Sequence, residues 1–393
     1  MEGIALESFN NTEVAFAAKS NWKLKKAYWL FSIVKNHALS RISTSLAKMF
    51  PIKPLIKATI FDHFCGGETI NESGKVIDLL AKFNIQAILD YSVEGGQSEK
   101  VFDETMEEIL RTIIYAGNND HIPFAVFKVT GIAPEDVLEK VQNNQKLNVD
   151  EKEAYSRVVA RIDKLCGTSY EQNVPIFIDA EDTWYQDVID DIVYDMMGKY
   201  NRKETIVFNT FQMYRKDMLS NLQTAINVAR EKGYYLGAKL VRGAYMENEQ
   251  ERAVEKGYEN PICVDKASTD RSYNNGLKAC IDNFDIVSVA NCTHNEYSSY
   301  YLAKLMEEKG IGRNDKKVYF SQLLGMSDNI SFNLAKAGYN VAKYVPYGPV
   351  KSVMPYLIRR AEENTSVAGQ STREHALIRK EITRRKQLSK KTA

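Results

Sequence analysis

Cysteine is scarce in this chain, and the few cysteines show no pattern. The five cysteines among the 393 residues are widely scattered and odd in number, and no two of them form a CxxC pair. Such spacing indicates neither a disulfide framework nor a zinc site. We therefore expect free thiols, no bound metal and a reducing compartment.

The chain also lacks an excess of charge of either sign. Its 52 lysine and arginine residues nearly balance 51 aspartate and glutamate residues, so no global field favours nucleic acid or an acidic partner. The most apolar early run, residues 29–34, is far too short to span a bilayer. Glu2, Glu7 and Glu13 disfavour a mitochondrial transit peptide at the start. These absences indicate a soluble protein without a secretory signal.

Nucleotide-binding fingerprints are missing as well. No G-x-G-x-x-G follows any β-prone run, and neither a Walker motif nor an internal repeat occurs. These absences disfavour a doubly wound nucleotide-binding sheet, although an open sheet stays an alternative on pattern alone.

What the chain does have, from Asn84 onward, is a regular alternation of short β-branched or aromatic runs with long helical stretches. The eight runs are Ile85 to Asp90, Ile122 to Val129, Val174 to Asp179, Thr205 to Gln212, Tyr235 to Val241, Asp285 to Ala290, Lys317 to Ser321 and Asn340 to Val345. Strands that alternate with helices run parallel, and eight such units are what a closed barrel requires. The sequence thus predicts an α/β fold, a (βα)8 TIM-type barrel.

The parts on either side of this barrel differ in composition from it. We expect a helical N-terminal segment over residues 1–75, the catalytic barrel over residues 76–370, and a basic tail over residues 371–393. Residues 379–391 are poor in apolar side chains, so we expect a frayed, solvated end there.

One stretch near the C-terminal end, YVPYGPVKSVMPYLIRRAEEN, combines a strand end, a turn rich in proline and glycine, and a helix. On that helix Arg359 and Arg360 lie within about one turn of Glu363. A solvated salt-bridge face is the simpler interpretation. Paired guanidiniums, however, match the fork of a carboxylate or a phosphate. We therefore predict that the two arginines clamp an anion, and that Tyr344 and Tyr356 form the walls of this site.

Polar residues stand at or just after the end of every predicted strand, where the loops of a barrel converge. In chain order they are Asp90, Lys128, Asp179, Gln212, Lys239 with Arg242, Thr293 with His294, Gln322 and Tyr344. A single residue of this kind is usually a satisfied rim residue. Because all eight strands carry one, we predict a polar site on this face. Gly243 and Ala244 would let the backbone approach a flat ligand closely.

Eight short motifs, in this order between residues 60 and 370, together resemble those of the FAD-dependent proline dehydrogenases. They are FCGGETI (64–70), FKVTG (127–131), IFIDAE (176–181), NTFQ (209–212), KLVRGAYM (239–246), THN (293–295), LLGM (323–326) and YVPYG…YLIRRAEEN (344–364). The resemblance implies a (βα)8 barrel that oxidises L-proline to Δ1-pyrroline-5-carboxylate, the first step of proline catabolism to glutamate. It also implies FAD, which takes the hydride from proline C5 at its N5 atom, and a membrane quinone as electron acceptor.

The resemblance further implies residue roles by matching position. Lys128, Arg359 and Arg360 would bind the proline carboxylate, and Asp179 would support them. The walls around the pyrrolidine ring would be Leu323, Ala244, Tyr245, Tyr344 and Tyr356. The flavin would be held by Gln212, Lys239, Val241, Arg242, Gly243, Thr293 and His294, with Glu363 bridging the clamp helix to it. Glu68 would form an ion pair with Arg359 when the site closes.

One motif departs from the bifunctional bacterial branch of that family. Lys239 stands where that branch has arginine, and Arg242 stands where it has lysine. The donor near flavin N5 would then be an ammonium group instead of a planar fork. Because no aldehyde dehydrogenase domain follows, the resemblance implies the monofunctional type. It would work in the cytoplasm or the mitochondrial matrix, with peripheral contact to the inner membrane.

Two other functions stay open from the residues alone. A class I aldolase on the same barrel would use Lys128 as the Schiff-base nucleophile. A catalytically silent barrel would bind an amino acid or another anion without turning it over. Flavin that is bound to the purified protein and bleached by proline would separate the oxidase-type reaction from both.

Overall fold

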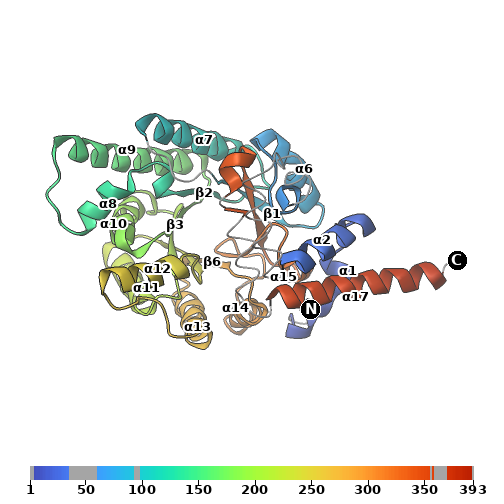
Figure 1. Cartoon of the computed structure of the whole chain (residues 1–393). Coiled ribbons are helices and arrows are strands. Elements are labelled where there is room, and N and C mark those ends of the chain that lie inside the picture. Colours follow the sequence, from blue (N-terminus) through green and yellow to red (C-terminus); the bar gives the residue numbers. More distant parts are fainter. Residues whose placement is uncertain (1–3, 35–59, 93–97, 355, 358–369, 392–393) are drawn as a thin grey trace.

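Eight parallel strands form a nearly closed barrel with helices around it (Figure 1). The computed structural model describes residues 4–34, 60–92, 98–354, 356–357 and 370–391. The strands are β1 (Gln86–Tyr91), β2 (Ala125–Lys128), β3 (Ile176–Asp179), β4 (Val207–Gln212), β5 (Leu236–Val241), β6 (Val287–Cys292), β7 (Val318–Leu323) and β8 (Val341–Tyr347). Their order is β1-β8-β7-β6-β5-β4-β3-β2. At the remaining seam between β1 and β2, the Ala87 amide donates to the His121 carbonyl at 2.8 Å.

Helices connect the strands and cover the outside of the barrel (Figure 1). Those within the barrel region are α6 (Ile70–Ala81), α7 (Glu99–Gly117), η3 (Val129–Gly131), α8 (Glu135–Gln142), α9 (Val149–Gln172), α10 (Thr183–Tyr200), α11 (Met218–Lys232), α12 (Met246–Lys256), α13 (Lys266–Asp282), α14 (Glu296–Glu308) and α15 (Asp328–Lys336). The flanking helices are η1 (Leu6–Asn10), α1 (Thr12–Ala15), α2 (Asn21–Val34), α5 (Asp62–Phe64) and α17 (Gln370–Lys391).

Local sequence signals explain where several of these helices begin and end. Asn148 and Glu151 form a capping box at the start of α9, and the Thr69 side chain caps α6. Gly233 and Gly257 end α11 and α12 in the left-handed conformation, which glycine adopts without a steric cost.

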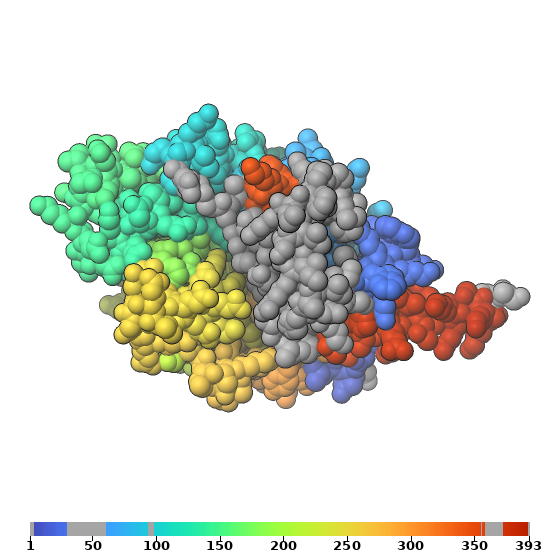
Figure 2. All heavy atoms as spheres, viewed as in Figure 1, coloured from blue at the N-terminus to red at the C-terminus, as the bar shows by residue number. Residues whose placement is uncertain are grey.

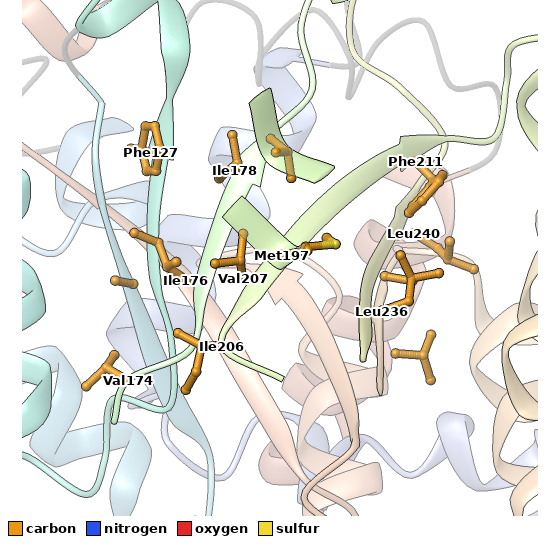
Figure 3. Close-up of a cluster of buried hydrophobic side chains, with 14 of the residues drawn as sticks. Phe127, Val174, Ile176, Ile178, Met197, Ile206, Val207, Phe211, Leu236 and Leu240 are labelled. Atoms are coloured by element: carbon orange, nitrogen blue, oxygen red, sulfur yellow. The ribbon is translucent and has the colours of Figure 1, made fainter. Parts of the chain in front are cut away.

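Strand alternation divides the core into two layers. Outward-facing side chains such as Ile176, Ile178 and Leu236 pack against the helices, and Figure 3 shows part of this layer, including Met197 of α10. Inward-facing aromatic and aliphatic residues fill the barrel itself: Ile88, Phe124, Val126, Phe177, Phe208, Ala290, Ala342 and Tyr344. The barrel floor is therefore a packed plug, and the polar ends of the strands lie above it.

All eight predicted strands are confirmed, and so is the (βα)8 fold class, because every strand pair recorded in the sheet is parallel. An open doubly wound sheet is wrong, since β8 pairs with β1. The expected boundary between residues 75 and 76 falls inside α6.

The expectation of a frayed C-terminal end is wrong. Residues 379–391 belong to α17, which packs along α2 beside the barrel (Figure 1). Leu377 and Ile378 of α17 are buried against Leu24 and Ala27 of α2. Burial of this shared apolar stripe offsets the loss of conformational entropy on forming α17, which a polar helix alone in water could not offset.

Candidate active site

A cavity of about 580 Å³ opens at the C-terminal ends of the strands. Its inner wall follows from alternation, because the inward-facing positions above the aromatic plug lie in the C-terminal half of each strand. The lining comprises Asp90, Lys128, Asp179, Ala180, Thr210, Gln212, Lys239, Val241, Arg242, Gly243, Ala244, Tyr245, Lys266, Cys292, Thr293, His294, Asn295, Glu296, Tyr297, Ser321, Gln322, Leu323, Met326, Tyr344, Tyr356 and Arg373.

Asp179 is the electrostatic centre of this cavity. One of its carboxylate oxygens accepts from Lys128 Nζ at 3.0 Å, and the other accepts from Lys239 Nζ. Burial alone would raise the pKa of Asp179, but the two ammonium groups outweigh burial and hold it at about 2. The carboxylate therefore stays ionised at any physiological pH, which makes it a poor proton acceptor and a fixed anchor for both lysines.

Tyr344 of β8 completes the same network. Its hydroxyl lies 2.7 Å from Lys239 Nζ and donates to Asp179 at 3.2 Å. Lys239 Nζ also lies 4.7 Å from the centre of the Tyr344 ring, a distance typical of a cation–π contact. Burial raises the pKa of the Tyr344 phenol well above its ordinary value, so the hydroxyl stays protonated.

A second polar group lies along β5 and β6. Arg242 donates to Asp270 through Nε at 2.9 Å and to the Thr293 hydroxyl at 2.5 Å. Its guanidinium lies 4.4 Å from the centre of the Tyr273 ring. The planar fork is thus fixed on three sides by α13 and the β6–α14 loop, and it lines the cavity in one orientation.

Gln212 and Gly243 give the cavity the features of a site for a flat ring. The Gln212 amide nitrogen donates to the Glu181 carbonyl at 2.9 Å, whereas its buried carbonyl oxygen has no hydrogen-bond partner among the described residues. Gly243 has φ +139°, and a Cβ there would lie 2.2 Å from the Tyr214 ring. A side chain at this position is therefore excluded, and the backbone lies open to the cavity.

The remaining walls come from β7, β8 and the loops that follow them. Leu323 and Tyr356 pack in one apolar cluster with Phe64 and Met326. His294 Nδ1 lies 2.9 Å from the Ser327 hydroxyl, which holds the imidazole against the cavity. One side of the cavity is thus apolar and the opposite side charged.

The structure brings together sixteen of the residues that the sequence points to, since all of them line this cavity: Asp90, Lys128, Asp179, Gln212, Lys239, Val241, Arg242, Gly243, Ala244, Tyr245, Thr293, His294, Gln322, Leu323, Tyr344 and Tyr356. Glu68 does not line it and instead lies near the first turn after β8, where its Oε2 is 3.4 Å from the Val350 amide. Arg359, Arg360 and Glu363 lie outside the described residues.

Sequence reasoning missed a group of residues at the cavity mouth. Arg373 of α17 lines the cavity and donates to Glu296 at 2.9 Å, and Glu296 and Tyr297 begin α14. Lys266 lines it from the start of α13. Glu296 follows directly after the THN motif, which was a usable signal, whereas nothing local to Arg373 indicates that α17 returns to the barrel.

No helix in the described part of the chain is long and apolar enough to cross a membrane.

A cavity with charged and apolar walls at the C-terminal face of a (βα)8 barrel is typical of TIM-barrel enzymes that act on small molecules. A family model described as proline dehydrogenase matches residues 74–373. The chain belongs to the proline dehydrogenase family, whose name describes an oxidoreductase acting on proline.

Individual proteins are similar to this chain along most of its length. The carbapenem antibiotics biosynthesis protein CarD of Pectobacterium carotovorum subsp. carotovorum is 34% identical over 322 residues, which are 82% of this chain and 83% of that protein. Mitochondrial proline dehydrogenase 1 of Dictyostelium discoideum is 31% identical over 427 residues, covering 95% of this chain and 74% of that protein.

A solved structure shares the fold. Proline utilization A from Bdellovibrio bacteriovorus, inactivated by N-propargylglycine, superposes with a TM-score of 0.73 at 18% identity. The match covers 90% of this chain but 38% of that chain, so the likeness concerns one part of a longer protein.

Proposed function

We propose that this chain catalyses the flavin-dependent oxidation of L-proline to Δ1-pyrroline-5-carboxylate and passes the electrons to a quinone. The observation that carries the proposal is the cluster of Lys128, Asp179, Lys239 and Tyr344 at the base of the cavity, in a chain that belongs to the proline dehydrogenase family. The cluster supplies positive charge for a carboxylate beside an apolar wall for a ring.

The residues that line the cavity fit FAD. The unpaired Gln212 carbonyl oxygen suits an imide N–H such as a flavin ring carries. Gly243 leaves the backbone open for a flat ring, and Arg242 offers a fixed cation. Val241, Lys239, Thr293 and His294 complete this wall. When bound, FAD would accept the hydride that proline C5 loses.

The chain's own residues would bind and orient the substrate. Lys128 would pair with the proline carboxylate, together with Arg359 and Arg360, which follow β8 in the sequence. Asp179 would keep Lys128 and Lys239 at fixed positions, because its pKa of about 2 keeps it charged. Leu323, Ala244, Tyr245, Tyr344 and Tyr356 would enclose the pyrrolidine ring and exclude water. The substrate amine must be neutral to donate its lone pair as the imine forms.

Contact with a membrane would bring the site to a membrane quinone, and one surface suits it. Trp22 and Trp29 are 67% and 66% exposed, and their spacing of seven places both on one face of α2. The neighbouring α17 is rich in exposed lysine and arginine, and Figure 2 shows both helices projecting from one side of the molecule. Tryptophan and basic side chains are the residues that bind the interface of an anionic bilayer.

Vesicle sedimentation tests this contact. We expect binding to vesicles that contain phosphatidylglycerol, weaker binding in high salt, and a loss of several-fold in affinity on Trp22→Ser with Trp29→Ser. The matched control replaces Val254 and Val264, which are 86% and 88% exposed, with serine. Equal affinity of both double variants would overturn this surface.

The aldolase alternative fits the cavity poorly. A Schiff-base nucleophile must be a neutral amine, whereas Lys128 is held as an ammonium group in an ion pair with Asp179. A silent anion-binding barrel would also use such a cation, but it has no need of the open flat wall beside Gln212 and Gly243.

The deciding experiment is the absorption spectrum of the purified protein before and after L-proline is added. We expect the bands of bound flavin and their bleaching by proline without other reductants. Protein that binds no flavin would overturn the cofactor assignment. Flavin that is present but not bleached would favour the silent barrel, and borohydride trapping of a carbonyl compound on Lys128 would favour the aldolase.

A further inference from the structure

The loop between β7 and α15 has an unusual residue at its end. Ser327 adopts the left-handed conformation with φ 50° and ψ 41°, which costs free energy for a residue with a side chain. Leu323, the last residue of β7, and Met326, just before Ser327, line the cavity. The left-handed conformation of Ser327 must be stabilised by other contacts. Two contacts, one from its backbone amide and one from its hydroxyl, supply this stabilisation.

The first contact comes from the C-terminal helix. The backbone amide of Ser327 donates to both carboxylate oxygens of Glu374, at 3.1 and 3.0 Å. Glu374 is 4% exposed, although it lies on α17, outside the barrel. Burial, and next the nearby Asp328, raise the pKa of Glu374 to about 7. A buried carboxyl beside another carboxylate is costly, so the position is not one that packing alone would favour.

The second contact leads into the cavity. The Ser327 hydroxyl lies 2.9 Å from Nδ1 of His294, which lines the cavity after β6. The next residue, Asp328, pairs with Lys343 of β8 at 2.9 Å and with Lys19 at 2.6 Å. Lys343 also donates to the Met326 carbonyl at 2.5 Å. Backbone and side chain of the loop are thus tied to α17, to β8 and to His294 at once.

We propose that Glu374 is a positioning residue for the active site: from α17 it fixes Ser327, and through Ser327 it sets the β7–α15 loop and the imidazole of His294. This inference rests on the proposed flavin-dependent reaction, in which His294 and Leu323 face cofactor and substrate. The helix that follows the barrel is therefore a part of the site and not an appendage, and Arg373, the preceding residue on it, lines the cavity mouth.

The chain offers a matched control on the same helix. Glu381 is also fully buried, but it accepts from Thr12 and from Arg384 and Arg385, not from the loop. Glu374→Ala and Glu381→Ala each remove one buried carboxylate from α17, and only the first removes the acceptor of the Ser327 amide. Glu374→Gln keeps one acceptor oxygen and serves as the conservative variant.

Two measurements on the purified proteins test the proposal. The first is the dissociation constant for FAD, and the second is amide hydrogen exchange of residues 324–327 with and without FAD. At equal folded fraction, we expect Glu374→Ala to raise the dissociation constant roughly ten-fold, because a buried amide loses its partner, and to speed exchange in the loop. Glu381→Ala should leave both within about two-fold, and Glu374→Gln should restore most of the loss.

A double variant adds a further check. If Glu374 acts through Ser327, adding Ser327→Ala to Glu374→Ala should raise the dissociation constant less than the two single changes predict together. Equal effects of Glu374→Ala and Glu381→Ala on FAD affinity and loop exchange would overturn the positioning role. A wild-type protein that binds no FAD would instead overturn the proposed function, while the comparison of loop exchange would still test the link between Glu374 and Ser327.

Discussion

Lys239 Nζ and the Tyr344 hydroxyl oxygen lie 2.7 Å apart, although one residue belongs to β5 and the other to β8. Both also contact one oxygen of Asp179 on β3. Three strands from different sides of the barrel thus meet in one buried group of hydrogen bonds. Loss of any member leaves the others with unpaired polar atoms, which is costly in a buried site.

Substitution of Tyr344 tests this group and the specificity of the site. We expect Tyr344→Ser to lower activity on proline through a cavity beside the ring, and to raise relative activity on 4-hydroxyproline, because the phenol fills the space of the extra hydroxyl. Tyr344→Phe keeps the ring and should still reject 4-hydroxyproline. Steady-state kinetics on both substrates decides this. Equal oxidation of the two substrates by the wild-type protein would show that Tyr344 is not the wall.

Replacement of either arginine of the predicted anion clamp with methionine tests the clamp. Arg359→Met or Arg360→Met should weaken proline binding by about 2–5 kcal/mol, because one partner of a desolvated charge pair is lost, while flavin stays bound. Tetrahydro-2-furoate, which keeps the carboxylate but lacks the amine, should compete with proline. Lys351→Met serves as the control, since Lys351 is exposed and lies in the helical residues 350–354 that follow the turn after β8. Unchanged Michaelis constants in both arginine variants would contradict the clamp.

Glu68 is tested as a gate for the clamp. Its position beside the Val350 amide puts it near the start of the segment that carries Arg359. Glu68→Ala should change kcat and KM together with little effect on flavin content. In a double-mutant cycle with Arg359→Met, purely additive effects would mean that the two side chains never meet. Glu68→Gln, which can still accept from Val350, separates that contact from an ion pair.

Acid titration tests the charge of Asp179. Its folded pKa of about 2 lies below the ordinary value of 3.8, so its contribution to stability is present above about pH 4 and is lost as the pH falls towards 2. Asp179→Asn should lower the free energy of unfolding by about 3–5 kcal/mol at neutral pH, since the buried Lys239 and the partly buried Lys128 lose their anionic partner. It should also flatten the stability profile below pH 4, whereas Asp120→Asn, at an exposed position, should not. Urea titrations across this pH range make the comparison.

The barrel could be predicted because its signals are local. Each strand is a short run of β-branched or aromatic residues, and parallel connection follows from the helices between them. The polar strand ends also follow from local sequence, since a barrel gathers its strand ends at one face. The runs predicted the strands to within a few residues: β6, for example, ends at Cys292 and not at Ala290.

Contacts between distant segments could not be predicted in this way. The apolar stripe of α17 is narrow, with Leu377, Ile378 and Ile382 among many charged residues. It is buried only because it packs against α2, near the other end of the chain. The pairing of Lys343 with Asp328 was hidden for a related reason. A lysine within a run of strand residues usually indicates a solvent-exposed position. Lys343 is instead fully buried, because Asp328 of α15 supplies a carboxylate that pairs with it.

The packing of α17 on α2 determines the order in which parts of the chain can fold during synthesis on the ribosome. The strands emerge in sequence and can close once β8 has left the exit tunnel, because β8 pairs with β1. Leu24 and Ala27, made near the beginning, share an apolar cluster with Ala15 and Phe16, and this cluster stays incomplete until Leu377 and Ile378 follow. The barrel of a nascent chain can thus be closed while the apolar face of α2 is still partly exposed. For that interval the chain is open to holdase chaperones and to early aggregation.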